Sequence, residues 1–219
     1  QFDILGQHQK AIADYDEALR FDPKFRVALS YRGASLRMIG QYDNALPDLE
    51  KAISMDAKDA YAFFNRGVIR SDRQDYAGAL ADLDTAIRLK ATDDAFFVSR
   101  GLAWLRSGNI DKALADYDEA IRLDPKGAMA YNNRSTAWRR KKEFDKSIAD
   151  SNEAIRLQPN SSDFYVNRGN GWMGKGDNEK GIADYREALR LNPQNETARD
   201  NLAVALKSTP QPSQSDKSR

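Results

Sequence analysis

The sequence predicts an all-α fold of tandem helix-turn-helix repeats, and two observations support this prediction. Residues of the same kind return every 34 positions, so that all three tryptophans, Trp104, Trp138 and Trp172, stand one period apart. Within each period, apolar residues recur three or four positions apart in two runs, which Gly, Asn, Asp or Pro separates. Each run therefore indicates one amphipathic helix, and the fixed period indicates helix pairs that bury their apolar faces against neighbouring copies.

We number the repeat from Asp94 as position 1 and apply the same register to every copy. Position 27 is always alanine and position 8 is always small: the residues are Ala18, Ala52, Ala86, Ala120, Ala154 and Ala188, and Gly33, Gly67, Gly101, Ser135 and Gly169. Small side chains at these positions let two helix backbones approach closely, while the ring at position 11 fills the space beside them. Glycine at position 15, as in Gly40, Gly108 and Gly176, should end the first helix in a left-handed conformation.

The elements follow in order along the chain. Residues 1–25 are interpreted as the last two-thirds of a repeat, with a shortened first helix and Gly6 at the position of the turn. Five complete repeats follow, at 26–59, 60–93, 94–127, 128–161 and 162–195. Residues 196–207 should form one more first helix that caps the open end, and residues 208–219, which hold no aliphatic or aromatic side chain, should be disordered. Because the chain starts in the middle of a repeat, we expect a fragment or a processed product.

The pattern of a ring or Leu at position 4, Gly at 8, an aromatic at 11, Ala at 20, an aromatic or Leu at 24, Ala at 27 and Pro at 32 resembles the tetratricopeptide repeat. The resemblance covers residues 1–207. It implies an all-α, right-handed α-solenoid, or superhelix, of 34-residue helix-turn-helix repeats. The amino-acid sequence of the repeats, which includes Ala-Asp-Tyr-Asp-Glu-Ala-Ile-Arg-Leu-Asp-Pro, is similar to that of bacterial members of the family.

Two charged rows depart from the usual pattern of that family, which has Leu at position 7. Here position 7 is arginine and position 23 is aspartate throughout: Arg32, Arg66, Arg100, Arg134 and Arg168, and Asp14, Asp48, Asp82, Asp116, Asp150 and Asp184. Guanidinium and carboxylate groups tolerate partial burial when they pair in a bidentate geometry. We therefore predict an Arg–Asp ladder between the stacked helices. The alternative is that both rows are solvated.

Composition excludes several classes of function. The net charge is +1, from 34 basic and 33 acidic residues, so the whole chain has no field suited to binding nucleic acid. No cysteine is present, which removes disulfides and thiolate metal sites, and no apolar run is long enough to span a bilayer. We expect no cofactor, no metal, no nucleic acid and no membrane partner, and the compartment stays open between cytoplasm and periplasm.

Only one stretch resembles a catalytic or nucleotide-binding motif. Residues 169–174 satisfy the dinucleotide fingerprint Gly-x-Gly-x-x-Gly. That motif needs a preceding strand and a helix that starts at the glycines, whereas the repeat register places these residues inside a first helix. Nucleotide binding at residues 169–176 is therefore the least favoured interpretation, and we predict that the chain is not an enzyme.

A second stripe on each first helix is the candidate binding surface. Positions 2, 5, 9 and 12 lie about a third of a turn from the packing positions 4, 8 and 11. In tetratricopeptide proteins these positions line the concave groove that binds partner peptides, and we call them the groove stripe. The middle of the stripe is apolar, arginines border it, and asparagines at position 6 could bond the backbone of a partner. The residues expected to bind are Tyr61, Phe64, Asn65, Val68, Val98, Leu102, Leu105, Arg106, Met129, Asn132 and Arg139.

These observations predict a non-catalytic protein-interaction scaffold. Its groove would bind a peptide or helical segment of a partner that is apolar with acidic flanks. The alternative is a structural array that assembles with copies of itself, because the shortened first repeat leaves the helix at residues 9–21 partly uncovered. The lysine that chaperone-docking relatives carry at position 5 is absent from every copy, so that role is not expected.

Overall fold

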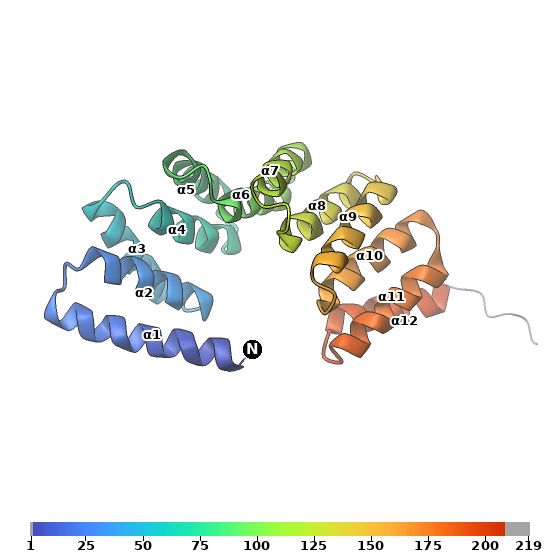
Figure 1. Cartoon of the computed structure of the whole chain (residues 1–219), viewed down its shortest axis with the longest axis horizontal. Helices are drawn as coiled ribbons and strands as arrows, with labels where there is room; N and C mark the ends of the chain where they lie inside the picture. The colour runs from blue at the N-terminus through green and yellow to red at the C-terminus, as the bar shows by residue number, and fades with distance from the viewer. Residues whose placement is uncertain (1, 209–219) are drawn as a thin grey trace, which may run out of the picture. The chain divides into compact units, whose positions relative to one another are not determined.

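The computed structural model describes the backbone of residues 2–208 and the side chains of residues 6–207. Within these residues the chain forms twelve α-helices and no β-strand, in two compact lobes. The N-terminal lobe, which ends at Leu123, contains α1 (Phe2–Phe21), α2 (Arg26–Met38), α3 (Tyr42–Met55), α4 (Ala60–Asp72), α5 (Tyr76–Leu89), α6 (Asp94–Arg106) and α7 (Ile110–Leu123) (Figure 1). The C-terminal lobe, which starts at Asp124, contains α8 (Ala128–Arg140), α9 (Phe144–Leu157), α10 (Ser162–Lys175), α11 (Asn178–Leu191) and α12 (Glu196–Ser208).

Each lobe is a stack of helix pairs. The first helices of successive repeats contact one another, α2 with α4 and α4 with α6 in one lobe, and α8 with α10 and α10 with α12 in the other. The second helices α3, α5, α9 and α11 each pack against the first helix of their own repeat and that of the next. The predicted fold class, an all-α solenoid of 34-residue helix pairs, is confirmed. The predicted disordered tail lies outside the described residues, apart from Ser208 at the end of α12.

The small residues of the repeat do allow close helix contacts. The position-27 alanines Ala52, Ala86, Ala120, Ala154 and Ala188 are completely buried. At position 8, a Cβ atom on Gly101 would lie 2.7 Å from the ring of Tyr117, which is itself fully buried. A methyl group there would overlap the ring, so glycine is required for α6 to pack this closely on α7.

The turn inside each repeat has one conformation in all five complete copies. Gly40, Gly108 and Gly176 at position 15 have φ of 78°, 91° and 89°, as the sequence predicts. Gln74 and Lys142 occupy the same position with φ of 66° and 63°. The stack therefore imposes the left-handed conformation even where the residue is not glycine, at a cost of roughly 1–2 kcal/mol for a residue that carries a Cβ.

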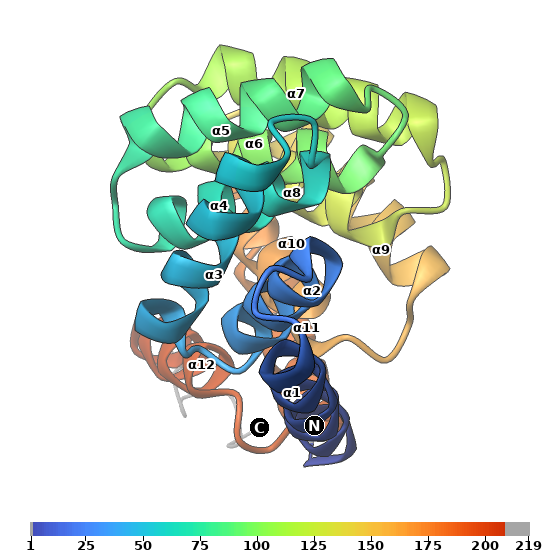
Figure 2. The same ribbon diagram turned by 90° about the vertical axis from the view of Figure 1, so that its left-hand side faces the viewer.

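The first helix of the chain corrects one expectation. We expected a turn at Gly6, but α1 runs unbroken from Phe2 to Phe21 and lies alongside α2 (Figures 1 and 2). Only Phe2 to Leu5 precede Gly6 in the helix, and so few residues cannot form a stable helix that folds back. Extending α1 instead keeps their backbone groups hydrogen-bonded.

The predicted Arg–Asp ladder is present in all five complete repeats. In each, the arginine Nε and Nη2 donate to the two carboxylate oxygens of the aspartate sixteen residues later, at 2.6–2.9 Å: the pairs are Arg32–Asp48, Arg66–Asp82, Arg100–Asp116, Arg134–Asp150 and Arg168–Asp184. The five carboxylates are buried. These pairs join the two helices of one repeat, and the hydrogen bond to Asp116 raises the pKa of Arg100 further above its ordinary value.

The third nitrogen of the same arginines links neighbouring repeats. Nη1 of Arg32 donates to Asp16 at 2.6 Å, and Nη1 of Arg100 donates to Asp84 at 2.7 Å. Asp16 and Asp84 both occupy position 25 of the preceding repeat. One guanidinium thus ties three helices together, which explains how the stack keeps an arginine where the family usually has Leu.

Candidate binding surface

The groove stripe of the N-terminal lobe is formed by α2, α4 and α6, and its predicted residues differ widely in exposure. Tyr61 is 44% exposed. Phe64, Val68, Val98 and Leu102 are half-buried. The apolar middle of the stripe therefore reaches the surface only partly, because its side chains also pack against neighbouring helices.

Phe64 shows why the middle of the stripe is only partly available. Its ring stacks on Phe96 of the next repeat, with ring centroids 4.8 Å apart. The guanidinium of Arg37 from the preceding repeat lies 5.8 Å from the centroid of the Phe64 ring. Phe96 is itself fully buried and makes an edge contact with Tyr61 at 5.5 Å. Phe64 thus contributes first to the contact between repeats and only second to an exposed surface.

Four predicted binding residues are corrected by the structure. Leu105 is 2% exposed and belongs to the core. Asn65 is 5% exposed, and its amide is occupied within the lobe, since Nδ2 donates to the Tyr61 carbonyl and Oδ1 accepts from Arg37 Nε, both at 2.7 Å. The corresponding correction applies to Asn132, which is 7% exposed.

Arg106, the fourth, is exposed, but Nη1 donates to Asp72 Oδ1 at 2.7 Å. A partner would have to compete with that ion pair for this guanidinium. Asp72 lies one repeat earlier on α4, at the same repeat position as Arg106.

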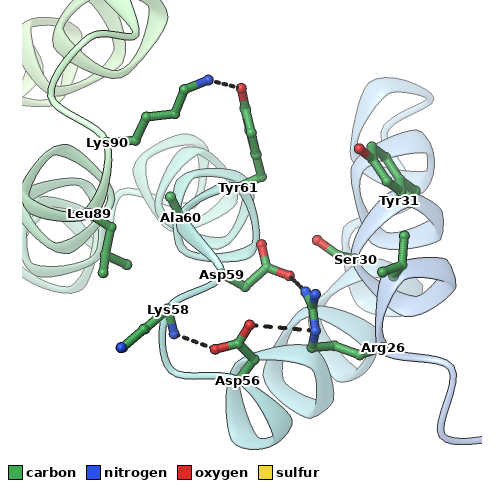
Figure 3. Close-up of a pocket in the computed structure, with 11 residues that line it drawn as sticks. Arg26, Ser30, Tyr31, Asp56, Lys58, Asp59, Ala60, Tyr61, Leu89 and Lys90 are labelled. Atoms are coloured by element: carbon green, nitrogen blue, oxygen red, sulfur yellow. Dashed lines mark hydrogen bonds and ion pairs between the residues drawn. The ribbon is translucent and has the colours of Figure 1, made fainter.

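A pocket lies at the N-terminal end of the stripe in the N-terminal lobe. It has a volume of about 390 Å³ and lies between α2, α4 and the end of α5 (Figure 3). Tyr31 on α2 and Tyr61 on α4 flank it (Figure 3). Val27, Ala60 and Leu89 also line it. The side chains of Tyr31, Tyr61, Val27 and Leu89 are 37–54% exposed, so the pocket gathers apolar surface that the fold itself leaves uncovered.

Paired charges surround this apolar lining. Nη1 of Arg26 donates to Asp59 at 2.6 Å, and Asp56 lies 3.6 Å from Arg26 Nε. On the opposite side, Tyr61 donates to Asp93 at 3.0 Å, and Lys90 contacts both the Tyr61 hydroxyl and Asp93. The hydrogen bond to Tyr61 raises the pKa of Lys90. These contacts fix the Tyr61 ring in place before any ligand arrives.

Sequence reasoning missed Tyr31 and Leu89. Tyr31 could have been found, because position 6 is otherwise asparagine or serine, as in Asn65 and Ser99. Leu89 carries no such signal, since the equivalent Leu123 is also leucine.

The C-terminal lobe carries three of the predicted residues on α8. Met129 is 54% exposed, Asn132 is buried and Arg139 is half-buried. The equivalent stripe on α10 contains Val166, which is only 5% exposed. The stripe of this lobe is therefore mostly polar.

The glycines of residues 169–174 lie inside α10, and Gly176 follows as its left-handed C-cap. The helix thus begins before these glycines, as the repeat register predicts. A metal-binding cluster of His, Cys, Asp or Glu side chains is not found among the described residues. In the same part of the chain, every helix is too short or too polar to cross a bilayer.

Solved structures with a similar fold carry low sequence identity. The crystal structure of the APC/C hetero-tetramer Cut9–Hcn1 matches 92% of this chain and 40% of that one, with a TM-score of 0.83 and 19% identity. YrrB, described as a TPR protein with an unusual peptide-binding site, matches 85% of this chain and 96% of that one, with a TM-score of 0.63 and 17% identity. A tetratricopeptide repeat protein from Parabacteroides merdae matches 92% and 78%, with a TM-score of 0.73 and 19% identity.

At these identities the likeness concerns the fold alone, and the chain spans less than half the length of the Cut9–Hcn1 chain that it matches. No curated protein matches the sequence significantly. Family models of the tetratricopeptide repeat, by contrast, match residues 2–25, 32–94, 98–162 and 162–195, which together cover most of the chain. The chain belongs to the tetratricopeptide repeat family.

Proposed function

We propose that this chain is a non-catalytic protein-interaction module, and that the pocket between α2, α4 and α5 receives an apolar side chain from a partner protein. The supporting observation is the gathering of Val27, Tyr31, Tyr61 and Leu89 around one cavity. Contiguous exposed apolar surface usually marks an interaction site, and tyrosine is enriched among the residues that dominate binding energy.

The charges around the pocket indicate what the anchor should be. Because Arg26 and Lys90 already pair with aspartates, an apolar or aromatic anchor fits better than a charged one. Lys58 lines the same pocket, and its ammonium has no ion-pair partner in the described part of the chain. A partner segment with an apolar anchor and an acidic neighbour would therefore be complementary, as would be expected from the arginine-bordered stripe.

YrrB is described as having a peptide-binding site, which is consistent with this proposal without locating the site here. The experiment is a selection from a random peptide display library with the full chain, followed by titration of the selected peptides. Tyr61→Ala should weaken them by about tenfold or more, because a central aromatic anchor of this kind usually contributes at least that much. Phe21→Ala is the matched control, since Phe21 is 84% exposed and lies outside the pocket lining.

Thermal unfolding of both variants must be measured beside the titration, because Tyr61 also touches Phe96. Selected peptides that bind Tyr61→Ala as tightly as the wild type would rule out the pocket. Light scattering over a range of concentrations separates this function from self-assembly, in which the mass would rise with concentration and the selection would return no peptide.

A further inference from the structure

A second pocket of the N-terminal lobe lies outside the groove stripe. It has a volume of about 320 Å³ and is lined by α1 and α3, which are the second helices of two successive repeats, by the loop after α1 and by α2. We call it the α1–α3 pocket. Its lining from α2 is Leu29 and Arg32, at positions 4 and 7, so the groove-stripe positions of α2 do not contribute to it.

The apolar part of this pocket joins the core to the surface. Leu19 is 9% exposed and Leu29 is 3% exposed, so both are anchored within the lobe. Pro23, in the loop before α2, and Pro47 on α3 are exposed and add two rings to the lining. Proline rings and buried leucines have little conformational freedom left to lose when a ligand arrives, so this lining favours contact with an apolar group.

Pro47 breaks the pattern of the repeat. Position 22 is alanine in the five other copies of the second helix, which are Ala13, Ala81, Ala115, Ala149 and Ala183. Pro47 lies inside α3 and has no N–H, so it cannot donate to the carbonyl of Asp43 four residues earlier. Its side chain is exposed, so burial does not offset this loss. Choices that break a local rule in this way are expected at functional sites.

Lys51 reverses the usual charge of its position. Position 26 is glutamate or threonine in the other copies, which are Glu17, Thr85, Glu119, Glu153 and Glu187. The Nζ of Lys51 donates to the carbonyl of Pro23 at 2.7 Å, which holds the ammonium group beside the pocket. An ammonium has three N–H groups, and the other two have no acceptor among the described residues.

Arg20 is a second available cation in the same lining. Its counterparts pair with the glutamate three residues earlier at 2.5–2.6 Å, as Arg122, Arg156 and Arg190 show. Glu17 precedes Arg20 at that spacing, yet no ion pair joins the two side chains. In the part of the chain that the structure describes, the guanidinium of Arg20 has no acceptor, so its planar set of donors is available to a ligand.

The carboxylates that line the pocket are already bonded. Both oxygens of Asp48 accept from Arg32, and Asp16 Oδ1 accepts from Arg32 Nη1 at 2.6 Å. Three cations and two carboxylates line the pocket, so its net charge is +1. The pocket therefore combines an apolar lining with two cations that lack carboxylate partners, and this combination is complementary to a carboxylate carried next to an apolar group.

We propose that the α1–α3 pocket binds an aspartate or glutamate side chain of a partner protein, together with an apolar residue beside it in the partner's sequence. The carboxylate pairs with Arg20 and Lys51, and the apolar neighbour contacts Pro23 and Pro47. A side chain that protrudes from a protein is favoured over a free small acid because much of the lining is exposed, whereas a small-molecule site buries most of its ligand. This surface is separate from the pocket at Tyr61, and its assignment does not depend on the proposed function.

The test is a selection from a random peptide display library with the full chain, after the library has been passed over the Lys51→Glu variant. That passage removes peptides that bind elsewhere, including those that bind the groove stripe. Because four other copies carry glutamate at this position, Lys51→Glu should keep the melting temperature of the wild type. The peptides that remain should carry Asp or Glu beside an apolar residue.

Titrations of a selected peptide then measure each contact. Changing its acidic residue to the amide should weaken binding to the wild type by about fivefold, the upper range of an exposed ion pair, and Arg20→Gln should weaken it similarly. Lys126→Glu is the control, because Lys126 is exposed and lies outside the pocket lining, and it should leave the affinity unchanged.

Pro47→Ala separates binding from folding. Alanine restores the N–H that α3 lacks, so the variant should melt at a higher temperature than the wild type. It should nevertheless bind the peptide more weakly, because one ring of the lining is gone. A loss of affinity with a gain of stability cannot result from misfolding.

Four results would overturn the assignment. They are a selection that returns no peptide after the passage over Lys51→Glu, peptides without an acidic residue, and an affinity that is unchanged by both Arg20→Gln and Pro47→Ala. The fourth is displacement of the peptide by phenylacetate at an equal or lower concentration, which would assign the pocket to a small organic acid instead. None of these results bears on the pocket at Tyr61, since peptides bound there are removed before the selection.

Discussion

Replacing Asp116 by alanine should destabilise the N-terminal lobe by about 2–4 kcal/mol, because Arg100 would lose its main carboxylate partner. The Asp116 side chain is 7% exposed and receives two hydrogen bonds from Arg100, at 2.6 and 2.9 Å. Breaking a fully buried ion pair costs about 3–5 kcal/mol. The expected loss of stability is smaller for Asp116→Ala because the Arg100 side chain is 22% exposed and keeps its bond to Asp84.

The size of this effect can be measured by thermal unfolding and by hydrogen exchange of α6 and α7. A lobe of this length should lose about 5–15 °C in melting temperature for that change in free energy. Hydrogen exchange resolves the lobe from the rest of the chain, since a solenoid need not unfold in one step. Arg122→Ala is the control, because Arg122 forms an exposed pair with Glu119 and its loss should leave both measurements unchanged.

The same pair also allows a test of coupling. The double variant Arg100→Leu with Asp116→Leu should be less destabilised than Asp116→Ala, since two apolar side chains leave no unpaired buried charge. The reasoning is refuted if Asp116→Ala lies within about 0.5 kcal/mol of the wild type, which is the usual range of surface substitutions. It is also refuted if the losses of stability in the single variants Arg100→Leu and Asp116→Leu add up to the loss in the double variant, because the two side chains would then not interact.

Three further predictions concern packing, backbone strain and pH. Gly174→Ala should cost about 1–3 kcal/mol in thermal unfolding because its Cβ would collide with the ring of Phe144, whereas Gly6→Ala, with nothing within 4 Å, should stabilise α1 by about 0.5–1 kcal/mol. Gln74→Gly should stabilise the chain by up to about 1 kcal/mol, since φ is 66° there, and an unchanged urea midpoint would contradict this. Burial raises the pKa of Tyr185 from 10 to about 12. The contribution of the neutral hydroxyl to stability is therefore complete below pH 10 and is lost as the pH rises through 12. The Tyr185→Phe variant should lose less stability than the wild type between pH 10 and pH 12, which urea midpoints at those two pH values would show.

The fold could be predicted from the sequence because the period fixes which residues meet. A small side chain at Ala120, a ring at Trp104 and a turn glycine at Gly108 each return one period later, so one correct register places every helix. The Arg–Asp ladder follows from the same register. The unbroken α1 was missed because the pattern marks Gly6 as a turn while too little chain precedes it for a separate helix.

The binding surface could be predicted only in outline, because exposure depends on residues outside the repeat pattern. Phe64 is covered by Phe96, which stands at position 3, a position that the pattern does not constrain. The Tyr31 side of the pocket depends on α1, since Tyr15 stacks on Tyr31 with ring centroids 6.1 Å apart. Neither contact has a signature in the spacing of the apolar residues. The exposure of each side chain in the groove stripe could therefore not be predicted from the repeat pattern.

The two lobes form different hydrogen bonds at equivalent positions of the groove stripe. Arg37 and Arg139 occupy the same position on the same kind of helix, and each is followed by an asparagine at position 6 of the next repeat. Asn65 accepts from Arg37, whereas Asn167 donates to Asn132, whose counterpart three repeats earlier is Ser30. The partner of the asparagine at position 6 thus changes together with the residue at position 5, which is Ser30 in one lobe and Asn132 in the other.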